Sequence, residues 1–173
     1  PEDALDITYD LAAGEYVVLD FSGEMPNIAT FTVTESDEEP AEAPEADLEI
    51  NLIDFAFAIP AQLPAGEQVW KIENLGQQWH EMGVMRLEEA MTKDEVAEVL
   101  MAAMMSENPD GPPAIPFEEV LFWSPMDPGT AAWITVDLEP GVYAITCFLP
   151  DFSSEEGMSH LAHGMIAIVT VTE

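Results

Sequence analysis

The chain has 173 residues, 48% of them hydrophobic, which is enough to bury a core as one domain or as one domain with an appendage. Its 35 acidic residues against 3 basic ones give a net charge of −32, and so few cations cannot form the basic face that nucleic acid or an anionic membrane surface requires. No apolar run approaches the roughly 18 residues of a transmembrane helix, so we expect no membrane span in this chain.

An acidic excess of this size destabilises a folded chain through self-repulsion unless salt screens the charges. The composition therefore predicts a protein adapted to a high-salt environment. The alternatives are a protein that collects Ca²⁺ or one that docks on a basic partner, although the sequence contains no D-x-[DN]-x-[DN]-G calcium loop.

The sequence begins at Pro1, with neither an initiator methionine nor a signal peptide, which predicts a processed product or a fragment. The N-terminal segment also repeats a pattern found near the C-terminus. Residues 7–16 match residues 134–143 at six of ten positions with an offset of 127, and residues 32–35 match residues 170–173 with an offset of 138. We interpret this segment as the last three strands of a preceding sandwich. The alternative is that two hairpins share a common turn sequence.

Residues 35–47 contain seven acidic residues and two prolines, without an aromatic or β-branched residue. Such a stretch cannot pack, and it predicts an extended, self-repelling linker. The chain is thereby divided into a β-strand segment over residues 1–34 that holds no metal site, the linker, and a main domain over residues 48–173.

Alternating apolar residues predict the strands of the main domain. The alternation changes phase between Leu52 and Phe55, which predicts one strand with a bulge near Ile53 and Asp54. Further strands are predicted over residues 68–73, 81–87, 131–137, 142–148 and 165–172.

One segment of the main domain breaks the β pattern. Thr92 and Glu95 form the ends of a capping box, and apolar residues at helical spacing follow them, so a helix is predicted over residues 93–105. The fold class is therefore all-β: a small sandwich with one helical insertion at about residues 92–105, preceded by a short β segment.

Candidate metal ligands gather around the only cysteine, which has no partner for an internal disulfide. Twelve residues separate Cys147 from His160, and four more separate His160 from Met165. Thiolate, imidazole and thioether donors suit copper in both of its oxidation states, whereas zinc prefers a fourth strong ligand. The alternative is that Cys147 is a small core residue.

Three segments resemble those of the cupredoxins, the blue-copper family, and the resemblance covers roughly residues 47–173. Residues 74–80 are similar to the family's N-x-G-x-x-H segment with one extra residue, residues 140–147 to its P-G-x-Y-x-x-x-C strand, and residues 160–165 to its H-x-x-x-G-M ending. The last segment is especially similar to the type 1 copper loop of copper nitrite reductases.

The resemblance implies a cupredoxin-like Greek-key β-sandwich that holds copper. By residue-to-residue carry-over, the metal ligands are His80, Cys147, His160 and Met165. The loop between Cys147 and His160 is longer than the usual cupredoxin loop, so it either folds over the site or marks a site that has decayed.

Three further residues are candidates near the metal. His163 is an alternative ligand to His160 or a histidine beside the site, and Asn74 is a supporting residue. Glu81 stands where plastocyanin-like proteins often carry Asn, which removes an expected hydrogen-bond donor. In the N-terminal repeat Asp20 takes the place of Cys147, so we expect one copper ion per chain.

The implied function is that of a type 1 copper electron-transfer protein cycling between Cu(I) and Cu(II). We expect no enzyme, because a catalytic copper site needs more than the 3 histidines present. The alternatives are a copper-free or copper-stabilised structural module of a cell surface or filament, and copper storage or delivery. We expect a redox partner protein, an extracytoplasmic location (secreted, periplasmic or at the cell surface), and, as a further option, a homo-oligomer or filament formed through the N-terminal strands.

We predict that the melting temperature rises steeply as salt is raised from tens of millimolar to the molar range, because salt screens the repulsion among 35 carboxylates. Thermal melts followed by circular dichroism measure this. A melting temperature that stays flat over that range would contradict the adaptation to salt.

Overall fold

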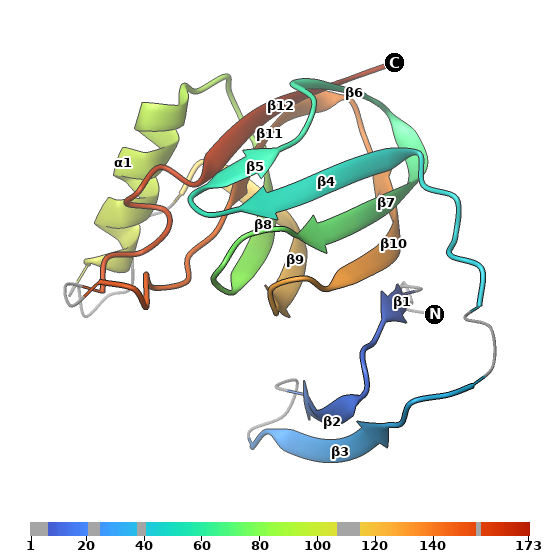
Figure 1. Ribbon diagram of the computed structural model, residues 1–173. Coiled ribbons are helices and arrows are strands. Elements are labelled where there is room, and N and C mark those ends of the chain that lie inside the picture. The colour runs from blue at the N-terminus through green and yellow to red at the C-terminus, as the bar shows by residue number, and fades with distance from the viewer. Residues whose placement is uncertain (1–6, 21–24, 38–40, 107–114, 155–156) are drawn as a thin grey trace.

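The computed structural model describes residues 7–20, 25–37, 41–106, 115–154 and 157–173. Two five-stranded sheets pack face to face as a β-sandwich, and a separate two-stranded sheet lies near the N-terminus (Figure 1). The predicted all-β sandwich with one helix is confirmed.

The first sheet has the strand order β1-β10-β7-β4-β5. β4 runs parallel to β7, and every other neighbouring pair is antiparallel. Between β4 and β7 the chain visits the second sheet, where it forms β6. The bounds are β1 Ile7–Asp10, β4 Leu48–Ile53, β5 Ala56–Ala58, β7 Gly66–Asn74 and β10 Ala131–Leu138.

The second sheet has the order β6-β12-β11-β8-β9. Its central strand β11 is flanked by β8 and β12, both antiparallel to it, while β6 pairs with β12 in parallel. The bounds are β6 Gln62–Pro64, β8 His80–Leu87, β9 Phe117–Met126, β11 Gly141–Thr146 and β12 Ile166–Thr172.

The facing sides of the two sheets share one core. Trp70 and Ile134 of the first sheet and Val84 and Ile145 of the second are at most 1% exposed. Burying each such side chain stabilises the fold by roughly 1.5 to 3 kcal/mol. Cys147 and Met165 belong to the same core cluster, so two candidate ligands are held by the packing that stabilises the sandwich.

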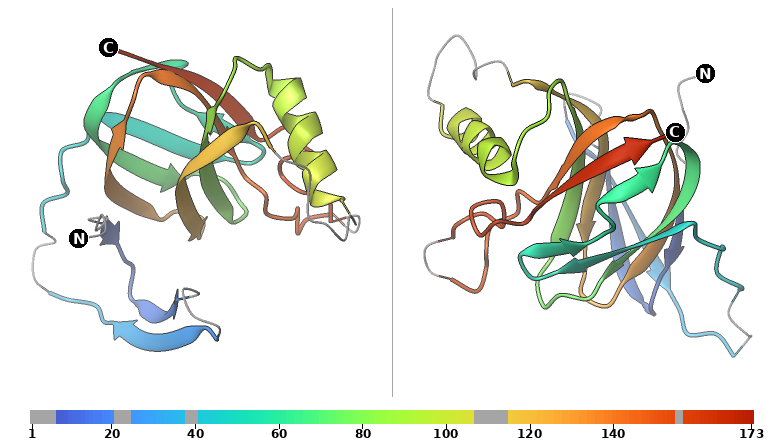
Figure 2. Two further views of the ribbon diagram at one scale, coloured as in Figure 1. Left: turned by 180° about the vertical axis from the view of Figure 1, so that it is seen from behind. Right: turned by 90° about the horizontal axis from the view of Figure 1, so that it is seen from above.

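The helix α1 spans Lys93–Met104 and lies on the outer side of the second sheet (Figure 2). Its predicted capping box is present: the Thr92 hydroxyl accepts from the Glu95 amide, and the Glu95 carboxylate accepts from the Thr92 amide. Val96 and Leu100 are buried in a second apolar cluster with Ile166 of β12. No helix in the described part of the chain is long and apolar enough to cross a membrane.

The predicted bulge near Ile53 and Asp54 is wrong. Ile53 pairs with Ala56, so Asp54 and Phe55 form a two-residue turn between the antiparallel strands β4 and β5. A change in alternation phase arises from a tight turn as well as from a bulge, and the local pattern does not separate the two. The strands β6 and β9 were not predicted from the sequence. β9 is an edge strand with an irregular register and few buried residues, so it lacks the alternation of a core strand.

The three N-terminal strands differ in their relation to the sandwich. β1 extends the first sheet by pairing with β10, whereas β2 (Gly14–Asp20) and β3 (Asn27–Val33) form a hairpin that lies apart from the sandwich (Figures 1 and 2). In the predicted linker, residues 35–37 and 41–46 are exposed and carry no strand or helix.

Candidate metal centre

The residues predicted as ligands come together at one end of the second sheet. His80 is the first residue of β8, Cys147 directly follows β11, and Met165 directly precedes β12. Because β8 and β12 both run antiparallel to β11, the start of each lies beside the end of β11. The connection from β11 to β12 carries His160 to the same place.

Three donor atoms converge there. One side-chain atom each of His80, Cys147 and His160 lies within 4.8 Å of the others, and all three residues are fully buried. The two histidine Nδ1 atoms are 3.1 Å apart, and the Cys147 Sγ is 3.3 Å from the His160 Nδ1. Since metal bonds of about 2.0 to 2.3 Å place neighbouring donors roughly 3 to 4 Å apart, this spacing fits a single ion.

A carboxylate orients the first histidine. The Nε2 of His80 lies 3.0 Å from the Oδ1 of Asp54, in the turn between β4 and β5. A proton on Nε2 that is donated to Asp54 leaves the Nδ1 of His80 as a bare lone pair directed at the other donors. A carboxylate behind a metal-binding imidazole selects the tautomer and raises its basicity.

Burial sets the protonation of the three donors. Desolvation raises the pKa of the Cys147 thiol to about 11. It lowers the pKa of His80 more than the nearby Asp54 raises it, and it also lowers the pKa of His160. In the metal-free protein at neutral pH the imidazoles are therefore neutral, which is the form that binds a metal, and the thiol must release its proton on binding.

His160 has a polar atom that the protein leaves unsatisfied. Its Nε2 is buried and has no hydrogen-bond partner among the described residues. If that atom carries the proton, the Nδ1 lone pairs of His160 and His80 face each other at 3.1 Å. Two converging lone pairs repel, and a cation between them removes that conflict, so the donor set fits a soft or borderline metal ion.

Met165 is tied to two of these residues through its backbone. Its amide donates to the His160 carbonyl at 2.9 Å, and its carbonyl accepts from the Cys147 amide at 3.3 Å. The Met165 side chain is fully buried in the core that contains Cys147. These contacts hold a thioether next to the donor cluster.

The long loop between Cys147 and His160 closes on itself. The Asp151 amide donates to the Met158 carbonyl at 2.7 Å, and the His160 amide donates to the Leu149 carbonyl at 2.7 Å. Hydrogen bonds from the hydroxyl and amide of Ser153 lower the pKa of Asp151 to about 2, so its carboxylate is charged. The two backbone hydrogen bonds of the loop return the chain to the donor cluster at His160.

His163 lies beside the donor cluster and outside it. Its Nε2 is 3.2 Å from the Oδ2 of Asp151, and its ring lies 4.4 Å from the ring of Phe55. One contact joins His163 to the loop and the other joins it to the turn between β4 and β5, whereas it is His160 that converges with Cys147.

Asn74 and Glu81 brace the two chain segments that carry ligands. The buried Asn74 amide donates to the carbonyls of Gln78 and Met126, and its side-chain oxygen accepts from the Gly76 amide, which fixes the turn before His80. Glu81 accepts from the Phe148 amide at 3.1 Å and so links β8 to the residue after Cys147. Glu81 thus acts through an acceptor where an Asn would offer a donor.

Sequence reasoning missed the turn residues Asp54 and Phe55 as parts of the site. Phe55 has φ of +62°, a left-handed conformation that is costly for an aromatic residue. Its ring meets the His160 ring edge-on at 5.2 Å, while Asp54 meets His80. The phase change in the alternation was the available signal, but only the pairing of β4 with β5 shows that it marks a turn.

The side chains of Asp54 and His80 leave no room for a Cβ at residue 76, so this position requires a glycine. A Cβ on Gly76 would lie 2.5 Å from the Asp54 Oδ1 and 2.6 Å from the His80 Nε2. The amides of Gln77 and Gln78 also donate to the Asp54 carboxylate. Burial alone would raise the pKa of Asp54, but these bonds and His80 together lower it.

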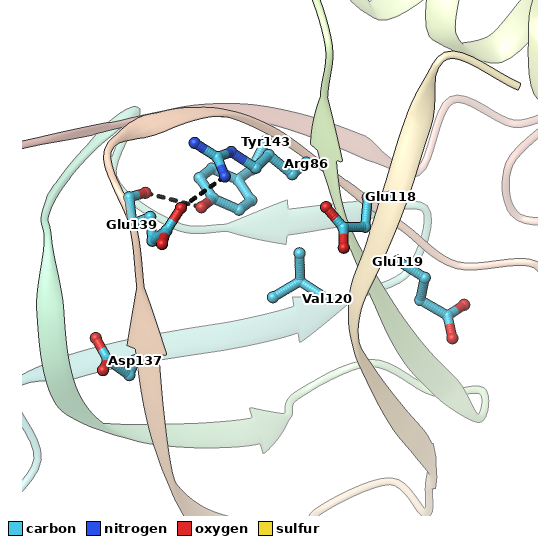
Figure 3. Close-up of a pocket in the computed structure, with 7 residues that line it drawn as sticks. All are labelled: Arg86, Glu118, Glu119, Val120, Asp137, Glu139 and Tyr143. Carbon is cyan, nitrogen blue, oxygen red and sulfur yellow. Dashed lines mark hydrogen bonds and ion pairs between the residues drawn. The ribbon is translucent and has the colours of Figure 1, made fainter.

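Apart from the donor cluster, the protein has an acidic hollow on its surface (Figure 3). There Arg86 donates to the Glu139 carboxylate at 2.7 Å and to the Pro140 carbonyl at 3.0 Å, and the Tyr143 hydroxyl donates to the Glu139 carbonyl at 2.8 Å. It contains no cysteine or histidine. Its lining residues are Arg86, Glu118, Glu119, Val120, Asp137, Glu139 and Tyr143.

The sandwich and the donor cluster decide the kind of fold. One end of the two packed sheets brings the predicted ligands together. They are His80 at the start of β8, Cys147 after β11, and His160 and Met165 before β12. This arrangement is the cupredoxin-like β-sandwich that the resemblance implies. The resemblance seen in the three sequence segments is therefore matched by the arrangement of the strands.

No protein-family model and no curated protein matches the sequence. Similar solved structures include a dithionite-reduced auracyanin from Roseiflexus castenholzii, with 23% identity, a TM-score of 0.46, and coverage of 72% of this chain and 95% of that one. Another is auracyanin A, a "blue" copper protein from Chloroflexus aurantiacus, with 16% identity, a TM-score of 0.43, and coverage of 72% and 99%. A purple cupredoxin from Nitrosopumilus maritimus has 14% identity, a TM-score of 0.40, and coverage of 73% and 100%.

We predict that Asp54→Ala lowers the affinity for Cu²⁺ by roughly 10- to 100-fold, because the carboxylate behind His80 orients the imidazole. Asp54→Asn keeps an acceptor for His80 and should retain most of the affinity. Competition titration with a chelator measures both. The control is Asp137→Ala, which removes a carboxylate from the acidic hollow; equal losses for Asp54→Ala and Asp137→Ala would contradict the role of Asp54.

Proposed function

We propose that this protein is a type 1 copper electron-transfer protein that cycles between Cu(I) and Cu(II), with one copper ion per chain. The observation that carries the proposal is the convergence of His80, Cys147 and His160 within 4.8 Å in the buried core. These three residues would hold the ion, and Met165 would be the weak fourth ligand.

The donor chemistry favours copper over zinc. One thiolate, two neutral imidazoles and a thioether suit both Cu(I) and Cu(II), whereas zinc sites use four strong donors. Bound copper supplies a one-electron couple. The protein supplies donors fixed at the ends of paired strands, so that a change of charge at the site moves them little.

The surroundings of the site support a carrier rather than an enzyme. His163, the remaining histidine, is engaged with Asp151 and Phe55. The donors are also covered, since His80, Cys147 and His160 are all fully buried. An electron can cross such a cover, whereas a substrate would need an open coordination position.

A surface beside the site offers a place for a redox partner. Trp79, next to His80 in the chain, is 52% exposed, and its ring meets the exposed ring of Phe152 edge-on. With Gln77 and Gln78 these two rings line a shallow hollow. We infer that the partner docks here, because Trp79 directly precedes His80 and Phe152 belongs to the loop that joins Cys147 to His160.

A second candidate function is a copper-stabilised structural module. The observation that favours it is the hairpin of β2 and β3, whose apolar side chains are exposed and suit assembly. For either function we infer a high-salt environment from the net charge of −32, and an extracytoplasmic location from the resemblance to the cupredoxins.

We predict that the purified protein, loaded with Cu²⁺ and oxidised, shows an intense absorption band at about 600 nm from the bond between copper and the Cys147 sulfur. Cys147→Ser should abolish the band without unfolding the sandwich, because the core is built by the strands. Visible and circular dichroism spectra measure the two effects. A colourless wild-type protein would contradict the carrier and favour the structural module.

We also predict that His160→Ala lowers the affinity for Cu²⁺ at least about 100-fold more than His163→Ala does, since only the His160 imidazole converges with Cys147 and His80. The two variants are matched controls for each other, being three residues apart in one loop. Copper titration followed at the thiolate band gives both affinities. A greater loss in His163→Ala would make His163 the ligand.

A further inference from the structure

The hairpin of β2 and β3 exposes more apolar surface than a stable hairpin can leave in water. Val17, Val18, Leu19, Ile28 and Phe31 are 43 to 65% exposed. Within the described part of the chain both strands also have a free edge, because each pairs only with the other. An apolar hairpin with free edges is a surface that another sheet covers.

The pairing within this hairpin reproduces the pairing of β11 with β12. Gly14 pairs with Val33, and Gly141 pairs with Val171. For each pair from Gly14 through Leu19, we add 127 to the residue number in β2 and 138 to the residue number of its partner in β3. The two resulting residues pair with each other between β11 and β12. The offsets are those of the sequence repeat, so the repeat is structural as well.

A side-chain hydrogen bond is repeated too. The Tyr143 hydroxyl donates to the carbonyl of Glu139, four residues earlier, at 2.8 Å (Figure 3). The Tyr16 hydroxyl donates to the carbonyl of Ala12, also four residues earlier, at 2.8 Å. This bond closes the corner before the strand in both places, so the local geometry of the corner is repeated together with the strand register.

The repeat shows which face of the hairpin should be buried. Tyr16, Val18 and Phe31 lie on one face, where the rings of Tyr16 and Phe31 stack. Their counterparts Tyr143, Ile145 and Val169 are at most 2% exposed and point into the core between the two sheets. The hairpin therefore has the inward face of a β-sandwich without the facing sheet.

The edge strand β1 fits the same scheme. Its counterpart is β10, and β1 pairs antiparallel with β10 so that Ile7 lies opposite its own counterpart, Ile134. Two equivalent edge strands thus meet about a local two-fold axis. That is the arrangement of two sandwiches joined edge to edge.

We propose that residues 7–33 are the last three strands of a second β-sandwich, and that the sheet covering the hairpin consists of strands equivalent to β4 through β9 that lie N-terminal to Pro1 in the same polypeptide. The free edge of β2 would receive an equivalent of β8, as β11 does. With Asp20 in place of Cys147, this second sandwich would lack the copper thiolate.

Two observations favour the same polypeptide over a second copy of this chain. The sequence repeat extends into residues 1–6, where two of six positions match at the same offset of 127, Pro1 with Pro128 and Ala4 with Ala131. A second copy has no free β8 to offer, because β8 is paired on both edges, with β11 and β9.

The test is a fusion in which residues 47–127 of this chain are joined to Pro1 of the full 173-residue chain, so that Asp127 precedes Pro1 as it precedes Pro128. The added segment supplies the equivalents of β4 through β9. Hydrogen exchange in molar salt is measured for the amides of β2 and β3 in the chain and in the fusion. We expect exchange to slow by about 100-fold or more in the fusion, because strands that cover a core open far more rarely than a free hairpin.

Two matched variants of the fusion identify the covered face. Phe31→Asp places a charge at the counterpart of the buried Val169 and should abolish the slowing, while Thr32→Asp, at the counterpart of the partly exposed Thr170, should retain it. Unchanged exchange in the fusion, or equal effects of the two variants, would overturn the proposal.

The 173-residue chain provides a second measurement that does not depend on the folding of the fusion. We expect its β2 and β3 amides to exchange rapidly at every protein concentration. Slow exchange that appears together with a dimer in sedimentation would make a second copy the occupant and would also overturn the proposal. Neither measurement depends on copper, so the outcome is separate from that of the proposed function.

Discussion

The antiparallel pairing of β8 and β12 with β11 is the constraint on which the rest of the site depends. It places the start of two strands beside the end of the third, so His80, Cys147 and Met165 meet although they are far apart in sequence. Because these positions continue the buried core, the donors are held by the packing of the sandwich. The loop that brings His160 needs only to close on itself, which its backbone hydrogen bonds achieve.

Burial decides how the donors are supported. Asp54 is the partner of the second nitrogen of His80, whereas the Nε2 of His160 has no hydrogen-bond partner among the described residues. The turn that carries Asp54 places Phe55 in a left-handed conformation, and the ring of Phe55 then packs on His160. One strained turn therefore contacts both histidines, and Gly76 leaves the space that the turn requires.

Electrostatic repulsion acts at the acidic surface and not in the apolar core. Ion pairs contribute little to this fold, because the chain has 3 basic residues, and those of Lys71 and Arg86 lie on the surface. The core cluster between the two sheets consists of hydrophobic side chains. Repulsion among the carboxylates is therefore a property of the surface, where dissolved salt screens it.

The sequence by itself determined the all-β class, the helix with its capping box, the repeat at the two ends, and the spacing of Cys147, His160 and Met165. These features are local or depend on order along the chain, and side-chain chemistry and periodicity carry them. The resemblance assigned His160 with His163 as the alternative, and the tertiary structure brings His160 into the cluster. Only the tertiary structure decided that Asp54 stands behind His80 and that Glu81 links β8 to Phe148. Those contacts join residues that strand pairing brings together, and the same local pattern at Ile53 and Asp54 allows a bulge or a turn until β4 pairs with β5.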